Sequence, residues 1–336
     1  MISIGDTSRP LVAVLLLVLA GCGGNSGPLQ LKFGHVGAPG SLFALSAEHF
    51  ASIANERLGE RAEVVVFGSS QLGGDELLLH KLKLGTVELA LPSSIMSSFV
   101  AEFGLFDMPY LVQDREHMQR IEEEIVWPDL APLAAEAGYR IIGVWENGFR
   151  HITNNARPIV VPEDLQGIKL RTPRGVWRVR MFQLLGANPS PMPLSEVFVA
   201  LQTGVMDGQE NPLAQIHASK FQEVQRYLSL TGHVYTPAYV VAGTESWSRL
   251  PQDIRDTLEQ AAREVQSFVY ETAARLDDEL LEDIERAGVA INEIDRQRFI
   301  DASRPVYDQF SADVPGGREL TQRAAALAAA GSSSGR

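Results

Sequence analysis

The 336-residue sequence contains a single cysteine, Cys22, so no disulfide can form within the chain. Its seven histidines lack the paired spacing of metal ligands, and no glycine-rich loop ends in the Lys-Ser or Lys-Thr that would hold a phosphate. We therefore expect neither a metal nor another cofactor. Basic residues are in the minority, and the formal net charge is −13. This charge argues against nucleic acid or an anionic membrane surface as a partner.

Signals for an enzyme are equally scarce. The stretch Gly331-Ser-Ser-Ser-Gly335 matches the nucleophile-elbow pattern of hydrolases. It lies in a low-complexity tail, with no strand expected before it and no helix after it, so we interpret the match as chance. Binding without turnover is the better interpretation, and the chain is expected not to be an enzyme.

The N-terminus carries an export signal. Residues 10–21 form an apolar run that is too short to span a membrane as a mature helix. The stretch Leu19-Ala-Gly-Cys22 resembles a bacterial lipobox, in which the cysteine is lipidated and becomes the new N-terminus. We therefore predict a lipoprotein signal peptide over 1–22, a flexible tether over 23–30, and an exported, lipid-anchored protein. An ordinary signal peptide cut nearby is the alternative.

The chain is long enough for two domains, and its first part alternates strands with helices. Strands are predicted at 31–36, 63–67 and 87–91, with helices at 42–57 and 75–84 between them. This order predicts an α/β domain with a largely parallel sheet. Ligands bind beyond the carboxyl ends of such strands, which are followed here by three loop segments, Gly37–Ser41, Ser69–Asp75 and Pro92–Met96.

The C-terminal part is dominated by one long helical pattern. From Pro251 to Ala287 there is no further proline and no glycine, and apolar residues keep helical spacing throughout. At 1.5 Å per residue this helix is roughly 55 Å long, more than one small domain needs. After a last helix near 295–310, residues 313–336 are predicted to be a disordered tail.

Polar residues concentrate around Leu201–Pro212. This stretch predicts a helix end, a stop at Gly204, a very short strand and a turn at Asn211-Pro212, so that Asn211 sits on a break with its amide free. Upstream, the strand Ile168–Arg171 delivers Arg171 at its end. Between them, prolines hold 186–197 as a rigid loop.

These segments resemble a known family. The run Arg171-Thr-Pro, then Gly186-Ala-Asn-Pro-Ser-Pro-Met, then Ser195–Pro212 is similar to the signature of TRAP transporter solute-binding proteins, in the C4-dicarboxylate and sialic-acid receptor branch. The resemblance covers residues 31–310. It implies a two-lobed α/β fold of the periplasmic-binding-protein type, with mixed sheets, hinge strands and a long helix crossing both lobes. Lobe I would comprise 31–146 plus 236–276, and lobe II 147–235 plus 277–312.

The resemblance also implies ligand-binding residues in the second lobe. Arg171 occupies the motif position whose arginine clamps the ligand carboxylate, and a guanidinium fork suits that task. Arg150 has a counterpart that reaches the ligand, with a hinge-stabilising ion pair as the alternative. Asn211 would offer its amide, unless it only satisfies its own turn. Glu210 is interpreted as structural, because a bare carboxylate would repel an anionic ligand.

In the first lobe, Asp75 and Ser93 stand where the sialic-acid receptors place acidic ligand contacts. Asp75 keeps the acid, although it is equally suited to cap the helix that follows. Ser93 departs from the acidic residue, Val36 stands in place of an asparagine, and Leu194 in place of a phenylalanine. These departures weaken the case for sialic acid, and a smaller or less hydroxylated organic acid fits better.

The sequence thus predicts a periplasmic receptor that closes over an organic acid by hinge motion and delivers it to the small and large membrane subunits of a TRAP transporter. Three alternatives stay open: an exported lipoprotein enzyme acting on an acidic metabolite, the binding protein of an ATP-driven transporter, and a scaffold lipoprotein without a small ligand.

Overall fold

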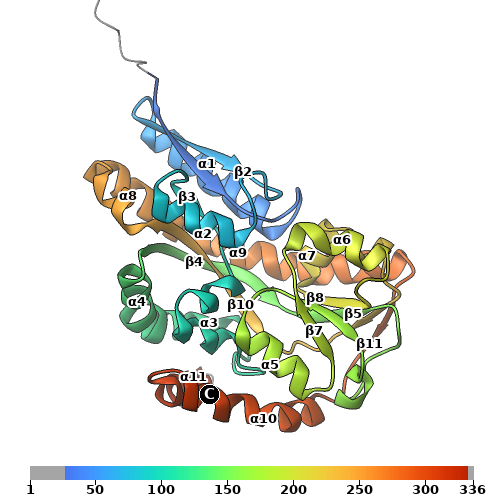
Figure 1. The fold of residues 1–336 in the computed structure, drawn as a ribbon. Coiled ribbons are helices and arrows are strands. Elements are labelled where there is room, and N and C mark those ends of the chain that lie inside the picture. The colour runs from blue at the N-terminus through green and yellow to red at the C-terminus, as the bar shows by residue number, and fades with distance from the viewer. Residues whose placement is uncertain (1–26, 332–336) are drawn as a thin grey trace, which may run out of the picture.

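A computed structural model describes residues 27–331, which form two mixed β-sheets flanked by helices (Figure 1). The predicted export signal over 1–22 and its lipobox lie outside the described residues. The predicted tether over 23–30 ends earlier than expected, because the first strand begins at Leu29. No helix within 27–331 combines the length and apolar character needed to cross a membrane.

The first sheet has five strands in the order β2-β1-β3-β10-β4. Its strands are β1 (Leu29–Gly34), β2 (Ala62–Phe67), β3 (Leu89–Ala90), β4 (Tyr139–Phe149) and β10 (Tyr235–Gly243). The predicted helices of this region form as α1 (Leu42–Leu58) and α2 (Asp75–Leu84). β1 pairs in parallel with β2 and β3, whereas β10 runs antiparallel to both β3 and β4. The expected parallel pairing is therefore present only among β1, β2 and β3, and the sheet as a whole is mixed.

The second sheet has six strands in the order β11-β9-β5-β8-β6-β7. They are β5 (His151–Asn154), β6 (Lys169–Thr172), β7 (Asn188–Pro191), β8 (Gly208–Asn211), β9 (Tyr227–Ser229) and β11 (Ala290–Asn292). β6 is parallel to its neighbours β7 and β8, and β5 is antiparallel to β8 and β9.

Two segments of this sheet differ from the sequence prediction. The polar run that was expected on a loop after a very short strand forms β8, fully buried between β5 and β6. The proline-rich segment expected as a rigid loop contains β7. β7 occupies the edge of the sheet and, among the described strands, pairs with one neighbour only. Its prolines lack backbone N–H groups, which is tolerated because an edge strand has no second neighbour to which it must donate hydrogen bonds.

Two chain crossings join the sheets. β4 runs for 11 residues through the first sheet, and after Arg150 the chain continues directly into β5 of the second. The return crossing leads from β9 to β10, where the pairing with β4 shifts register at Pro237. Such a bulge accommodates a proline, which cannot donate a ladder hydrogen bond.

The predicted long helix forms as a continuous 35-residue element, α9 (Gln252–Arg286). In Figure 1 it runs from beside α8 (Thr244–Arg249) past β4 to α7 (Leu213–Ala218). Its first half packs into the core around β1 and α1, which contains Leu258 and Val265. Its end contributes Ile284 to a separate cluster with Ile216 and Leu228. One helix therefore spans both halves, as expected, while the exact lobe boundaries stay a prediction.

The expectation of a disordered tail from residue 313 is wrong for the described part. Helix α11 (Gly317–Gly331) follows α10 (Arg296–Asp313), and both lie along the bottom of Figure 1. Leu320 and Ala324 are buried in the core, and His117 Nε2 lies 2.7 Å from the carbonyl oxygen of Ala324. Alanine is the strongest helix former, and its small side chain allows the close packing against α3 (Arg115–Ile121) that composition alone conceals.

The remaining helical elements cover the sheets. They are η1 (Ser94–Ser98), η2 (Ala101–Asp107), the π-helical η3 (Glu122–Leu130), α4 (Ala131–Glu136), η4 (Pro162–Leu165), α5 (Val176–Leu184), α6 (Leu194–Gln202) and η5 (Phe221–Glu223).

Candidate functional site

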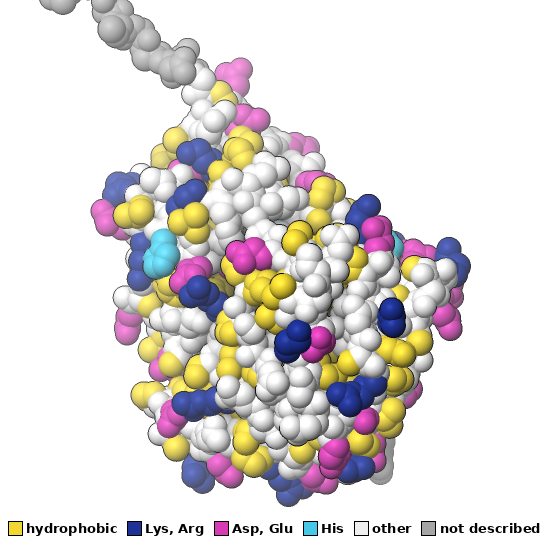
Figure 2. Space-filling model, turned by 45° about the vertical axis from the view of Figure 1, so that its right-hand side comes forward, with side chains coloured by type: hydrophobic (Ala, Val, Ile, Leu, Met, Phe, Trp, Pro, Cys, Tyr) yellow, Lys and Arg dark blue, Asp and Glu magenta, His cyan; other side chains and the backbone are white. Residues whose placement is uncertain are grey.

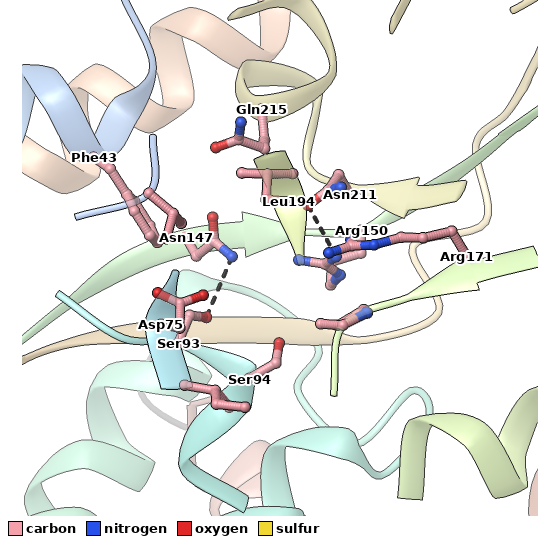
Figure 3. A pocket seen from close by; sticks show the side chains of 13 residues that line it. Phe43, Asp75, Ser93, Ser94, Asn147, Arg150, Arg171, Leu194, Asn211 and Gln215 are labelled. Carbon is pink, nitrogen blue, oxygen red and sulfur yellow. Dashed lines mark hydrogen bonds between the residues drawn. The ribbon is translucent and has the colours of Figure 1, made fainter. Parts of the chain in front are cut away.

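A cavity lies between the two sheets, and all five residues predicted as ligand contacts line it (Figure 3). Its first-sheet side comes from α1, the start of α2 and the segment after β3. Its second-sheet side comes from β6, α6, the end of β8 and α7. The full lining is Val36, Phe43, Asp75, Ser93, Ser94, Ile95, Asn147, Arg150, Arg171, Pro173, Leu194, Asn211 and Gln215.

Arg171 is placed in the cavity wall by strand alternation. In β6, Leu170 is buried in the core. Arg171 lies on the opposite face of the strand, the face that also carries the exposed Lys169. Arg171 is itself only 3% exposed, and its Nε and Nη2 donate to the carbonyl oxygen of Met192 at 2.9 and 2.5 Å. Burial lowers the pKa of Arg171 to about 9, because desolvation disfavours the charged form. The guanidinium stays charged at neutral pH and is stabilised by any anion that reaches it.

Arg150 forms the ion pair that the sequence left as an alternative to ligand contact. Its Nε lies 2.5 Å from Glu210 Oε2, and both side chains are almost completely buried. Its Nη2 donates to Asn211 Oδ1 at 2.9 Å. Arg150 therefore combines an ion pair with a place in the cavity wall.

Glu210 is a structural residue, as the sequence suggested, and it holds more than one cation. Arg178 Nη1 lies 2.9 Å from Glu210 Oε2, and His233 Nε2 lies 3.1 Å from the same oxygen. Arg178 Nη2 pairs in turn with Asp107 Oδ1 at 2.8 Å. Burial alone would raise the pKa of Glu210, but the charges of Arg150 and Arg178 outweigh it and hold that pKa well below its usual range.

Sequence analysis missed Arg178. It lies on α5 among Trp177, Met181 and Phe182, all of which are buried. A charged residue within such an apolar helix face is the signal that could have identified it, because buried arginines require a carboxylate partner.

The amide of Asn211 is engaged, so the expectation that it lies free on a turn is wrong. Asn211 ends β8 and pairs with His151 of β5. Its Oδ1 accepts from Arg150, and its Nδ2 donates to Gln209 Oε1 at 2.5 Å. The strand partners and the neighbouring guanidinium, neither visible from the local sequence, fix its position in the wall.

Asp75 is not the helix cap that was its alternative role. The N-cap of α2 is Gly74, and Asp75 is the first helical residue. Its Oδ1 is buried and has no hydrogen-bond partner among the described residues. Burial raises the pKa of Asp75 to about 7, although the charge of Arg171 opposes the shift. In Figure 3, Asp75 and Arg171 lie on opposite sides of the cavity.

The hydroxyl of Ser93 is already committed within the protein. It donates to the carbonyl oxygen of Pro237 at 2.7 Å and accepts from Asn147 Nδ2 at 3.2 Å. Ser94 is the neighbour whose Oγ is buried without a partner in the described structure. Sequence analysis named Ser93 but missed Ser94 and Asn147, which also line the cavity.

Residues 27–331 contain no group of three or more His, Cys, Asp and Glu side chains placed to hold a metal ion. On the face shown in Figure 2, basic and acidic side chains are interspersed, so the excess negative charge is not gathered there into one patch. The arginines in the cavity wall are therefore the local feature that would attract an anion.

Comparison with known proteins gives consistent matches along almost the whole fold. Residues 33–313 match the family model of the bacterial extracellular solute-binding protein, family 7 (DctP). The chain is 31% identical over 294 residues to the 2,3-diketo-L-gulonate-binding periplasmic protein YiaO of Escherichia coli (strain K12), covering 87% of this chain and 90% of that protein. It is also 31% identical over 332 residues to the C4-dicarboxylate-binding periplasmic protein DctP of Vibrio cholerae, covering 96% and 98%.

Solved structures show the same fold. The sugar acid binding protein of Advenella mimigardefordensis, in complex with galactonate, superposes with a TM-score of 0.86 at 33% identity, covering 90% of this chain and 98% of that one. A TRAP periplasmic solute-binding protein of Sulfurospirillum deleyianum with bound succinate gives 0.85 at 32% identity, covering 90% and 99%. The chain therefore belongs to the bacterial extracellular solute-binding protein family 7, the DctP family of TRAP transporter receptors.

Proposed function

We propose that this protein captures a small organic acid outside the cytoplasm and hands it to the membrane subunits of a TRAP transporter. The observation that carries the proposal is that, in the described part of the chain, the charge of Arg171 is buried without a carboxylate partner. It is a buried cation in the cavity wall, and among residues 27–331 it has no carboxylate within ion-pair distance. A buried charge without a partner is costly, so a carboxylate ligand stabilises this arrangement by supplying one.

The geometry of Arg171 suits this role. Two of its N–H groups hold the Met192 carbonyl, which fixes the plane of the guanidinium. Three N–H groups stay available for the two oxygens of a carboxylate. Closure of the two halves around the ligand would remove water and strengthen the contact. Related TRAP receptors have been solved with galactonate, D-erythronate and succinate, each of which carries a carboxylate.

Membrane attachment is a separate part of the proposal. Cys22 of the lipobox would carry the lipid and tether the receptor near its transporter. This segment lies outside the described residues, so the proposal rests on the sequence pattern alone. Labelling with a radioactive fatty acid, in the wild type and in Cys22→Ser, tests it, and undiminished labelling of the variant would disprove it.

The binding experiment is thermal unfolding of the mature chain against a panel of carboxylic and sugar acids. An acid at about 100 times its dissociation constant should stabilise the fold by roughly 2.7 kcal/mol, which raises the midpoint by about 4 °C in a chain of this length. Arg171→Ala should abolish the shift. Arg275→Ala, which removes an exposed arginine on α9, is the matched control and should retain it. A shift that persists undiminished in Arg171→Ala would contradict the proposal.

The same experiment separates a receptor from an enzyme. The bound acid should be recovered chemically unchanged after prolonged incubation, as judged by NMR of the released ligand. Conversion of the acid would show turnover and would favour the alternative of an exported enzyme.

A further inference from the structure

The cavity has two chemically different ends. Arg171 supplies positive charge from β6 of the second sheet, whereas Asp75 supplies a carboxyl group from the start of α2. Figure 3 shows the two side chains on opposite sides of the cavity. A ligand that spans the cavity therefore meets a cation at one end and a carboxyl group at the other.

Only one ligand carboxylate can find a cation here. The cavity lining contains two cationic side chains, Arg150 and Arg171. The charge of Arg150 is compensated by Glu210, which Arg150 shares with Arg178, and Arg178 is further compensated by Asp107. A second ligand carboxylate would thus have no uncompensated cation among the residues that line the cavity.

The Asp75 end is unfavourable for a second carboxylate and favourable for hydroxyl groups. Within residues 27–331, neither Asp75 Oδ1 nor Ser94 Oγ, which also lines the cavity, has a hydrogen-bond partner, and both atoms are buried. Buried polar atoms without partners are rare in folded proteins and cost free energy until a partner arrives. A carboxylate oxygen accepts hydrogen bonds, so a ligand hydroxyl is a suitable partner. A second carboxylate would meet a like charge in a poorly solvated place.

Building on the function proposed above, we propose that the ligand is a hydroxylated monocarboxylate and that Asp75 selects it against dicarboxylates. In this arrangement the ligand carboxylate binds Arg171, and hydroxyl groups at the far end of the ligand donate to Asp75 and contact Ser94. Asp75 is then the residue that determines specificity, while Arg171 provides the affinity common to all carboxylates.

The test uses ligand pairs that differ only at the far end. D-erythronate and meso-tartrate share their internal hydroxyl-bearing carbons, but D-erythronate ends in a hydroxymethyl group where meso-tartrate has a second carboxylate. D-galactonate and galactarate form the corresponding pair with a longer chain. The affinities are measured by isothermal titration calorimetry at about pH 8, where Asp75 is ionised. In the wild type, the ligand pair whose chain length gives the tighter binding should show at least a tenfold preference for the monocarboxylate.

Asp75→Asn should reduce that preference at least tenfold, because it removes the like charge that a second carboxylate meets and weakens the hydrogen bond that the hydroxyl donates. Ser94→Ala should weaken monocarboxylate binding several-fold. Asp278→Asn changes the same charge at an exposed position on α9 and should leave the preference unchanged. A structural defect in Asp75→Asn would lower both affinities together, so a changed ratio identifies a direct role.

The possible failures are distinguishable. Equal or tighter binding of the dicarboxylates by the wild type, or an unchanged ratio in Asp75→Asn, overturns the role of Asp75 while the receptor function stands. If no acid of either class binds and Arg171→Ala behaves like the wild type, the receptor proposal fails, and the selectivity proposal fails with it.

Discussion

Arg150 and Glu210 form a buried ion pair across the second sheet, with Arg150 Nε 2.5 Å from Glu210 Oε2. The pair joins the start of β5 to its neighbour β8, and it places Asn211 beside the cavity through the hydrogen bond from Arg150 Nη2. Because Glu210 also holds Arg178 and His233, a single carboxylate organises this side of the site.

Replacing Glu210 should destabilise the protein strongly. Glu210→Gln leaves the buried guanidinium of Arg150 without a compensating charge and leaves Arg178 with Asp107 alone, and breaking a buried pair in this way costs about 3–5 kcal/mol. Urea unfolding at neutral pH measures the loss. Glu264→Gln is the matched control, because its pair with Arg57 is exposed and solvent screens it, so its loss should change the stability far less. Equal losses in the two variants would contradict the central role of Glu210.

Asp75→Asn should make the ligand-free protein more stable in alkaline solution. Burial raises the pKa of Asp75 to about 7, so the folded state holds a proton that the unfolded chain releases near pH 4. The favourable contribution of the protonated form is lost as pH rises through the folded pKa, by about 1.4 kcal/mol per pH unit at most. Asn cannot ionise and avoids this loss.

The difference in the free energy of unfolding between Asp75→Asn and the wild type is the quantity to measure. It should change in favour of the variant as pH rises from about 4 to about 8. A difference that does not vary with pH would show that Asp75 titrates normally. Greater stability together with altered ligand preference would mark Asp75 as a residue retained for function.

Gly208→Ala should disturb the sheet that carries the site. A Cβ at Gly208 would lie 2.3 Å from the carbonyl oxygen of Thr153 and 2.8 Å from Asn154 Cβ. The closer contact is with backbone, so β8 must shift away from β5, which should cost about 1–3 kcal/mol and weaken ligand binding. In Gly74→Ala the nearest atom would be 4.0 Å away. That control should change stability by less than about 1 kcal/mol, as judged by thermal unfolding.

The pair of Arg174 and Glu76 should slow ligand release. Arg174 follows β6 of the second sheet, Glu76 lies on α2 beside the first, and Arg174 Nη1 is 3.2 Å from Glu76 Oε2. Both residues line a cavity that adjoins the binding site. An exposed pair of this kind contributes about 0.2–1 kcal/mol, so Arg174→Ala should speed dissociation by up to about fivefold.

Stopped-flow dissociation of the ligand measures this effect, which should shrink in about 1 M salt because the ions screen an exposed pair. Arg249→Ala removes another exposed ion pair, within α8, and should leave the dissociation rate unchanged. An equal acceleration in both variants would show that the pair across the site has no special role.

Most of the fold could be predicted because its signals are local. Strand alternation and helical periodicity located β1, α1, β2, α2 and the unbroken helix α9. The errors concern segments whose structure depends on a partner elsewhere. β8 is a strand because β5 and β6 satisfy its backbone, and α11 is ordered because α3 and α10 cover its apolar face.

The sequence by itself determined which chemistry is available. The resemblance to the family named Arg171, Arg150, Asn211, Asp75 and Ser93, and all of them line one cavity. Only the tertiary structure decided how each is used. It paired Arg150 with Glu210, and among residues 27–331 it left Arg171 without a carboxylate at ion-pair distance and Asp75 Oδ1 buried without a hydrogen-bond partner. The physical reason is that charge compensation and desolvation depend on distances between segments far apart in the chain, which no local pattern encodes.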